Sequence, residues 1–453
     1  MDFLKELASP QSYQHISLLH VVLGLVSLLF LPYLSLLLGS SFFSIYLGGQ
    51  ARKRNDHRLR RFAKDLIEMP MVMKSVPFLF GILPFFSIIL IYAQLLHRTS
   101  SIAISVFTAS FFVFVIAVVL LYAYRYAIRL GTLLDDVSDR FVKDAPSEAI
   151  SGEIDQYNSE NIASGNRVGV WGTVLLFISA FLFVAASALA IDPQSWDSVS
   201  TIFPSLISGL TWFRFLQLLT LGVALAGGTV LFFLFGWQGG RQNIGESYAE
   251  FLKGTVLPWT LIATLAQPFL LMLDLLLLPI RALSTLTFAG AIGSILFLFL
   301  IANFLYSMIK ESHFRFAGFA FYLFIGAFLF LGVRDASSIG SAVRPHAALL
   351  ASEFAKSEAE LKTRLGVNLV KLSAEDIFVG KCSACHSFTQ KVTGPAYNDV
   401  LPKYEGKKAE LVKFLLSPRK VDPAFPPMPA QGLKPSEAEA LADYLVKIYQ
   451  EKK

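Results

Sequence analysis

Long, nearly uncharged runs of apolar residues constrain the fold of this chain more than any other feature. Several of them reach the roughly 20 residues that an α-helix needs to cross about 30 Å of hydrocarbon. Charged residues make up only 16% of the 453 residues, against about 25% in an ordinary soluble domain. This composition excludes a soluble globular enzyme and a largely disordered chain. A transmembrane β-barrel is excluded as well, because its strands alternate apolar and polar residues in short segments.

Eight apolar runs, each bounded by charge, proline or glycine, are predicted to be membrane-spanning helices. They cover roughly residues 16–48, 71–96, 102–128, 168–191, 210–237, 257–280, 284–308 and 314–333. Residues 1–333 are therefore expected to form a transmembrane domain. The composition becomes polar after Val333, so residues 334–372 are expected to be a linker, partly helical around 348–365, and residues 373–453 a small soluble domain. The predicted fold class is all-α.

The loops between the spans predict the orientation in the membrane. The loop after the first span is strongly basic, with Asp56 as its acidic residue, and it is expected in the cytoplasm because basic loops stay inside. Its basic residues are Arg52, Lys53, Arg54, Arg58, Arg60, Arg61 and Lys64. The loop from Asp192 to Gly209 has no Lys or Arg, as expected outside. With eight spans, both the N-terminus and the C-terminal domain then lie outside, and the first span serves as an uncleaved signal anchor.

The two cysteines lie in Cys382-Ser383-Ala384-Cys385-His386, the C-x-x-C-H pattern of covalent c-type heme. Two thiols one helical turn apart can add to the two vinyl groups, while the adjacent imidazole reaches the iron. One covalent heme c is therefore expected, with Cys382, Cys385 and His386 as its attachment site. The net charge of +6 does not indicate nucleic acid, because the basic residues mostly flank the apolar runs.

Residues 373–453 resemble the class I, mitochondrial-type cytochrome c family over nearly their whole length. Phe378 stands where the family places an aromatic residue on its first helix, and Tyr444-Leu445 matches the pair that packs against that helix. The resemblance implies that the Pro395 carbonyl orients the proximal imidazole and that Met428, between prolines, is the sixth ligand. A buried packing role for Met428 is the alternative. The resemblance is completed by two capping-box patterns, Ser373 with Asp376 and Ser436 with Glu439.

A His/Met pair implies a six-coordinate, relatively high-potential heme that carries one electron and leaves no open position for substrate. Five lysines are candidates for a ring around the heme edge that steers an acidic partner. They are Lys381, Lys391, Lys403, Lys407 and Lys408, and an ordinary solvated lysine surface is the alternative.

Residues 10–240 resemble subunit I of the cytochrome bd quinol oxidases. The resemblance rests on the outward N-terminus, His20 in the first helix after Tyr13-Gln14-His15, the basic loop, and Phe213-Arg214-Phe215-Leu216-Gln217. It implies a heme b ligand at His20, but Gln217 stands where the family has a second ligating His. Spans two and three also contain no glutamate, and the loop at Arg281–Leu283 is too short for the family's quinol-binding loop.

Four polar residues are expected in the outer half of the membrane domain: His20, Arg214, Asp274 and Arg281. Ionisable groups within spans usually face protein or a watery cavity. Asp274 and Arg281 are seven residues apart and so share a helix face. The four residues are interpreted as a polar site for a quinone head or for the propionates of a heme in a neighbouring subunit. A structural ion pair between Asp274 and an arginine, and a hydrogen-bonded packing role for His20, are the alternatives.

These patterns predict a membrane-anchored monoheme c-type cytochrome that serves as the electron-transfer subunit of a respiratory or photosynthetic complex. Its expected partners are membrane-embedded redox subunits, a soluble or membrane-bound periplasmic electron carrier, and the bilayer. Because this heme is attached outside the bacterial cytoplasmic membrane, the expected location is that membrane, with the cytochrome domain in the periplasm. Two alternatives remain: a subunit of a bd-like quinol-oxidising or oxygen-reducing complex, and a structural role that holds a complex together.

Overall fold

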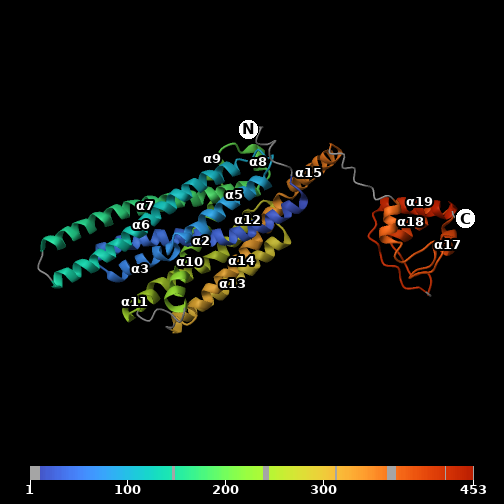
Figure 1. Ribbon diagram of the computed structural model, residues 1–453. Coiled ribbons are helices and arrows are strands. Elements are labelled where there is room, and N and C mark those ends of the chain that lie inside the picture. Colours follow the sequence, from blue (N-terminus) through green and yellow to red (C-terminus); the bar gives the residue numbers. More distant parts are fainter. Residues whose placement is uncertain are drawn as a thin grey trace. The chain divides into compact units, whose positions relative to one another are not determined.

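The computed structural model describes residues 11–144, 148–237, 244–311, 314–364, 374–423 and 425–451. It divides the chain into two compact units, Met1–Phe354 and Ala355–Lys453, and the described residues of both are helical without strands (Figure 1). The predicted all-α fold class is therefore confirmed.

The first unit is a bundle in which eight helical segments of the described chain are long and apolar enough to cross a membrane. Its helices are α2 (Tyr13–Arg54), α3 (His57–Glu68), α4 (Ser75–Pro77), α5 (Leu83–Leu95), α6 (Ala103–Asp144), α7 (Glu148–Ile191), α8 (Ser195–Ser198), α9 (Phe203–Leu206), α10 (Gly209–Leu231), α11 (Glu246–Phe251), α12 (Leu257–Leu277), α13 (Thr285–Glu311) and α14 (Ala317–Ala342). Short 3₁₀ or π turns join or extend several of them, at Met69–Met71, Phe78–Ile82, Phe232–Gly236, Leu252–Val256 and Ile280–Ala282.

Helix α2 packs against α3, α5, α7, α10 and α14 and so holds the bundle together (Figure 1). It begins where the Ser12 side chain accepts a hydrogen bond of 3.2 Å from the backbone of His15, and it ends at Asn55, whose left-handed conformation caps the helix. Its crossing with α10 is very close, since a Cβ added at Gly39 would lie 2.1 Å from the Gly222 carbonyl oxygen. Only glycine permits this approach of two backbones.

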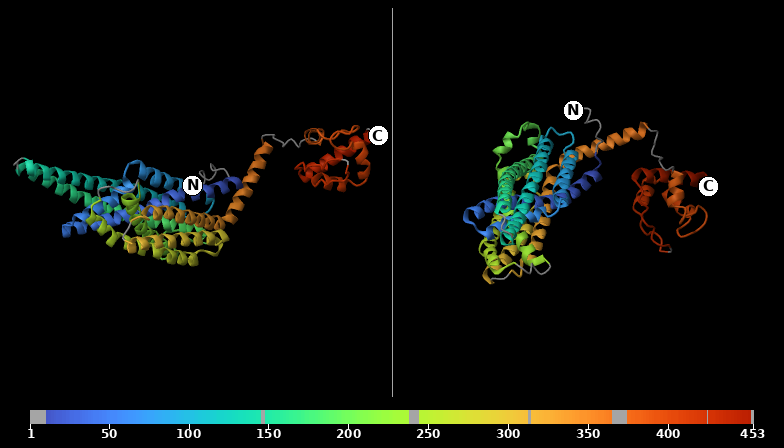
Figure 2. Two further views of the ribbon diagram at one scale, coloured as in Figure 1. Left: turned by 90° about the horizontal axis from the view of Figure 1, so that it is seen from below. Right: turned by 60° about the vertical axis from the view of Figure 1, so that its left-hand side comes forward.

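Helices α6 and α7 form a hairpin that is longer than the bilayer is thick. They have 42 and 44 residues, which correspond to about 63–66 Å at 1.5 Å per residue. They lie side by side in Figures 1 and 2 and extend past the other helices at one end. Both helices are longer than the spans predicted at 102–128 and 168–191. Hydrogen bonds between the two helices, such as that from Asn158 Nδ2 to Asp135 Oδ1 at 2.6 Å, keep their polar continuations helical.

The predicted limit of the last span also differs from the structure. The polar composition after Val333 predicted a linker, but α14 continues to Ala342 and α15 (Arg344–Arg364) follows almost directly. Helix α14 remains helical through this stretch because Arg334 and Ser338 are buried against the bundle. The boundary between the two compact units falls within α15, after Phe354.

The second unit is a small helical domain around one apolar core. Its helices are α16 (Ala374–Lys381), α17 (Tyr397–Val400), α18 (Lys408–Leu416) and α19 (Pro435–Glu451), with a 3₁₀ turn at Leu401–Tyr404. The expected contact between its first and last helices is present, since the rings of Phe378 and Tyr444 are 5.8 Å apart. Leu445 is fully buried in the same core.

The two predicted helix starts in this unit have different outcomes. The capping box at Ser436 and Glu439 is wrong, because α19 already begins at Pro435 and the Glu437 carboxylate accepts the backbone N–H of Lys434 at 3.0 Å. Ser373, predicted to cap the first helix, lies outside the described residues.

Candidate functional sites

The C-x-x-C-H segment forms a turn directly after α16. The backbone N–H of Cys382 donates to the Phe378 carbonyl at 2.9 Å and continues the helical pattern, and the N–H of His386 donates to the Cys382 carbonyl at 3.0 Å. The Cys382 side chain is buried and that of Cys385 is exposed. Burial raises the pKa of the Cys382 thiol, an effect that the Tyr397 hydroxyl and the Lys381 ammonium partly offset.

The His386 imidazole is fixed by its neighbours in a single orientation. Its Nδ1 donates to the Pro395 carbonyl oxygen at 3.0 Å, which is the bond that the family resemblance implies. A ring that donates from Nδ1 keeps a lone pair on Nε2 for a metal ion. Gly394 is required beside it, since a Cβ added there would lie 2.3 Å from the imidazole Cε1.

A cavity of about 920 Å³, counting the space at its open mouth, lies against His386 and Met428. The other residues that line this cavity are mainly apolar, and they include Leu401, Leu411 and Leu445. An imidazole and a thioether at one apolar cavity are donors of the kind that would hold a heme iron. The described residues contain no group of three or more His, Cys, Asp or Glu that would hold a bare metal ion. The residues therefore fit a heme better than a mononuclear zinc site.

Basic side chains gather at the rim of this cavity. Lys403, Arg419 and Lys420 line it together with one carboxylate, that of Asp422. The other predicted lysines have separate roles. Lys381 donates to the Gln431 carbonyl at 3.2 Å, and Lys408 pairs with Asp443 at 2.6 Å. Lys391 and Lys407 are exposed.

A helical domain with this cavity behind a C-x-x-C-H turn defines the class of c-type cytochromes. Comparison with known proteins shows the same, since the chain is 34% identical over 80 residues to cytochrome c-551 of Pseudomonas denitrificans, covering 17% of this chain and 98% of that relative. It is 38% identical over 71 residues to cytochrome c-552 of Hydrogenobacter thermophilus, covering 15% of this chain and 71% of the relative. The chain therefore belongs to the cytochrome c family through a domain of about this length. No family model and no solved structure matches the chain.

These matches do not extend to most of the membrane unit, because they cover 15–17% of the chain. The resemblance of residues 10–240 to the cytochrome bd subunit thus stays a prediction. His20, its proposed heme ligand, lies near α14, with its ring 3.9 Å from where a Cβ of Gly340 would stand. Its Nδ1 is buried without a hydrogen-bond partner among the described residues.

Two of the four predicted polar membrane residues do meet. Arg214 Nε donates to Asp274 Oδ1 at 2.7 Å, and the other oxygen of Asp274 pairs with Arg334 Nη2. Arg334 Nε lies 3.0 Å from Asp335 Oδ1. The Asp274 side chain has no exposed area, whereas Arg281 is exposed and does not join the cluster.

The ion pair between Asp274 and an arginine, one of the two interpretations of this site, is therefore present, but Arg334 takes the place expected for Arg281. Sequence reasoning missed Arg334 because the change of composition at this residue indicated the end of the membrane domain. An arginine directly after an apolar run is equally compatible with a span that continues, and only the packing of α14 distinguishes the two cases.

Proposed function

We propose that this protein is a membrane-anchored electron carrier, in which the C-terminal domain holds one covalently attached heme c and exchanges single electrons with a redox partner. The observation that carries the proposal is that His386 and Met428 line the same apolar cavity beside the C-x-x-C-H turn. Heme in such a site supplies reversible one-electron chemistry, at a potential that Met/His ligation raises. No substrate is bound or converted in this proposal.

The residues of the chain have separate roles in holding the group. The Cys382 and Cys385 thiols form the covalent attachment. His386 supplies Nε2 to the iron because Pro395 holds the other ring nitrogen. Met428 supplies its thioether, and Lys381, by donating to the Gln431 carbonyl, ties the segment after Met428 to the end of α16.

The surrounding residues keep water away and set the charge at the rim. The leucine walls of the cavity lower the local dielectric, which favours the less charged, reduced iron. The basic groups of Lys403, Arg419 and Lys420 could pair with the propionate carboxylates of a bound heme at the mouth of the cavity. They also give the rim a positive charge that would favour association with an acidic partner.

We further propose that the protein resides in a bacterial cytoplasmic membrane, with the cytochrome domain in the periplasm, as a subunit of a respiratory or photosynthetic complex. The eight membrane segments support this, because one heme needs far fewer for an anchor. Partners bearing further cofactors would occupy the membrane surface of the bundle. Purification of the chain alone from native membranes, with no co-migrating subunit, would contradict this part of the proposal.

The first test is a pyridine hemochrome spectrum of the purified full chain. One equivalent of heme c and no heme b or d is the expected result, and additional b-type heme would revive the alternative in which His20 binds heme. Replacement of either cysteine, Cys382→Ala or Cys385→Ala, should change the pyridine hemochrome from its c-type form or abolish heme incorporation.

The role of Met428 is tested by Met428→Ala against Met73→Ala, a control at an exposed methionine of the other unit. Met428→Ala should lower the reduction potential and remove the optical signature of thioether ligation, whereas Met73→Ala should change neither. If Met428 only packs, the protein would lose stability but keep both properties.

A further inference from the structure

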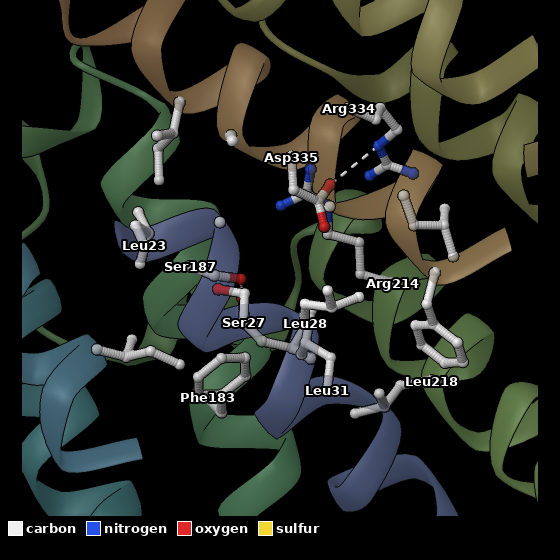
Figure 3. Close-up of a pocket in the computed structure, with 18 of the residues that line it drawn as sticks. Leu23, Ser27, Leu28, Leu31, Phe183, Ser187, Arg214, Leu218, Arg334 and Asp335 are labelled. Atoms are coloured by element: carbon white, nitrogen blue, oxygen red, sulfur yellow. Dashed lines mark hydrogen bonds and ion pairs between the residues drawn. The ribbon is translucent and has the colours of Figure 1, made fainter. Parts of the chain in front are cut away.

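A second cavity lies inside the membrane unit, between α2, α5, α7, α10 and α14 (Figure 3). It has about 1070 Å³ of space, counting its open side. Arg214 and Asp335 mark one end and Leu31 and Leu218 the other, with Ser27 and Ser187 facing each other between them (Figure 3). The cavity thus has a polar end and an apolar end.

The polar end offers hydrogen-bond donors that the protein itself does not use. Arg214 Nη2 is buried and has no hydrogen-bond partner among the described residues, although Nε of the same side chain is bound to Asp274. A buried donor without a partner is unfavourable by about 1–3 kcal/mol or more. Within the described chain the hydroxyl of Ser27 and the amide of Gln217 also line the cavity without a side-chain hydrogen bond. A bound carbonyl oxygen would satisfy such donors.

The charges at this end already balance. Arg214 and Arg334 are matched by Asp274 and Asp335, all within one network of ion pairs. No other Lys, Arg, Asp, Glu or His lines the cavity among the described residues. Since an unpaired charge buried at such a site is strongly unfavourable, an anionic or cationic head group is disfavoured. The ligand that fits is uncharged and accepts hydrogen bonds.

The walls indicate the shape of the ligand. Three aromatic side chains, Tyr92, Phe183 and Phe328, line the cavity, and aromatic rings pack well against a planar partner. Between Arg214 and Leu221 the cavity follows α10 for seven residues, or about 10 Å. The apolar end therefore suits the start of a hydrocarbon tail and the polar end a flat head.

We propose that this cavity binds a neutral, lipid-soluble molecule with a planar, carbonyl-bearing ring and an apolar tail, which is the chemistry of a quinone. The polar ring binds toward Arg214 and Gln217, and the tail leaves past the leucines. This is a statement about binding in the membrane unit. It does not rest on the heme of the other unit, so the two can fail separately.

The test uses the full chain with its heme, reconstituted in phosphatidylcholine nanodiscs and titrated with decylubiquinone. Bound and free decylubiquinone are separated at equilibrium and quantified. Saturable binding of one equivalent is expected, and solvent extraction of protein from native membranes should yield a quinone in comparable amount. Extraction of phospholipid alone, together with no saturable binding, would show that the cavity holds only acyl chains and would overturn the proposal.

A cavity-filling variant locates the site. A Cβ added at Gly332, which lines the cavity, meets its nearest neighbour only at 4.0 Å, so Gly332→Leu is expected to fit and to weaken decylubiquinone binding by about tenfold or more. Gly49→Leu is the matched control, because a Cβ at Gly49 meets nothing within 4 Å and Gly49 does not line the cavity. Equal affinity in the two variants would contradict the proposal.

Ser27→Val provides an independent variant if Gly332→Leu does not fold. It retains a similar volume but removes one donor, so the affinity should fall by about threefold to tenfold. Tryptophan fluorescence checks folding of the membrane unit, because all five tryptophans lie before residue 260. A folded Ser27→Val protein with unchanged affinity would place the ligand elsewhere and refute the assignment.

Discussion

The two units of this protein bury polar groups in opposite ways. In the membrane unit, Asp274 is completely enclosed and both of its oxygens pair with arginines. In the cytochrome unit, one ring nitrogen of His386 donates a hydrogen bond to the Pro395 carbonyl, and the ring lines a cavity. The first arrangement satisfies charge with charge within the protein. The second prepares a donor for a group that is not part of the polypeptide.

This difference explains which interactions each unit depends on. Removing one partner of a buried ion pair destabilises the protein, because the remaining charge keeps its desolvation penalty without the compensating attraction. A cavity for a prosthetic group instead depends on shape and on the orientation of a few atoms. Removing a buried charge should therefore destabilise the membrane unit most, and adding volume beside the cavity should destabilise the cytochrome unit most. Tryptophan fluorescence reports the first unit and heme absorbance the second, so the two can be followed in one sample.

The largest effect is expected from Asp274→Asn. It would leave Arg214 and Arg334 without their shared carboxylate, and the loss should be about 3–5 kcal/mol in the free energy of unfolding of the membrane unit. Denaturant unfolding in detergent, followed by tryptophan fluorescence, measures it. Arg60→Ala is the control within the same unit, because both side chains of its ion pair with Asp135 are exposed and such a pair contributes at most about 0.5 kcal/mol. Comparable effects of the two substitutions would contradict the enclosed ion cluster.

Gly394→Ala tests the opposite sensitivity in the cytochrome unit. The added Cβ would overlap the His386 ring, so the imidazole must move, and a loss of about 1–3 kcal/mol is expected from the overpacking. Heme absorbance during unfolding and the reduction potential should both change. Gly380→Ala is the matched control in the helix before the heme motif. A Cβ there meets nothing within 4 Å, so this change should stabilise the helix by about 0.5–1 kcal/mol. The prediction is wrong if Gly394→Ala unfolds like wild type.

The two sites also differ in how far the sequence could predict them. The residues of the heme motif are neighbours in the chain, so their spacing predicted the motif. The family resemblance indicated the Pro395 carbonyl, which lies nine residues after His386. In the membrane cluster, Arg214 lies 60 residues before Asp274 and Arg334 lies 60 residues after it. Helical periodicity places a residue on a face of its own helix but does not say which helix lies opposite. Arg281 was therefore chosen on spacing alone, whereas tertiary packing brings Arg334 to Asp274.

Local spacing also limited the prediction of helix lengths. The apolar runs located the eight spans, but the polar continuations of α6 and α7 lie outside these runs and so were not included in the predicted helices. They are held by contacts between the two helices, such as Asn161 Nδ2 to the Ala127 carbonyl at 2.9 Å. The cavity lined by Arg214 and Asp335 was likewise not predictable, because it is formed by five helices from distant parts of the chain.

A smaller effect is expected at the end of the membrane unit where α15 begins. His346 Nε2 donates to the His97 carbonyl at 2.8 Å, and Arg98 pairs with Glu353 at 2.8 Å. Burial lowers the pKa of both histidines; for His97 the cation of Arg98 and the nearby His346 lower it further, while Glu353 opposes the shift.

Because these pKa values are lower in the folded state, the unfolded chain binds more protons as the pH falls below about 6.5. The contribution of this contact is therefore complete above that pH and is lost as the pH falls through the folded-state pKa values. Backbone hydrogen exchange should show reduced protection of residues 344–354 at pH 5.5 relative to pH 7.5. The double variant His97→Gln with His346→Gln should lose most of this pH dependence. Equal protection of the wild type at both pH values would contradict the prediction.

The smallest effect is expected from Lys408→Ala. Its ion pair with Asp443 joins α18 to α19 at 2.6 Å, a distance like that between Arg214 and Asp274, but both side chains are more than half exposed. Solvent screens such pairs, so the free energy of unfolding of the cytochrome unit should change by about 0.5 kcal/mol or less. Heme absorbance during denaturant unfolding measures the change. The two pairs have nearly the same distance between nitrogen and oxygen. A large loss for Lys408→Ala would therefore mean that this distance, rather than burial, determines the sensitivity to charge removal, and the contrast between the units would fail.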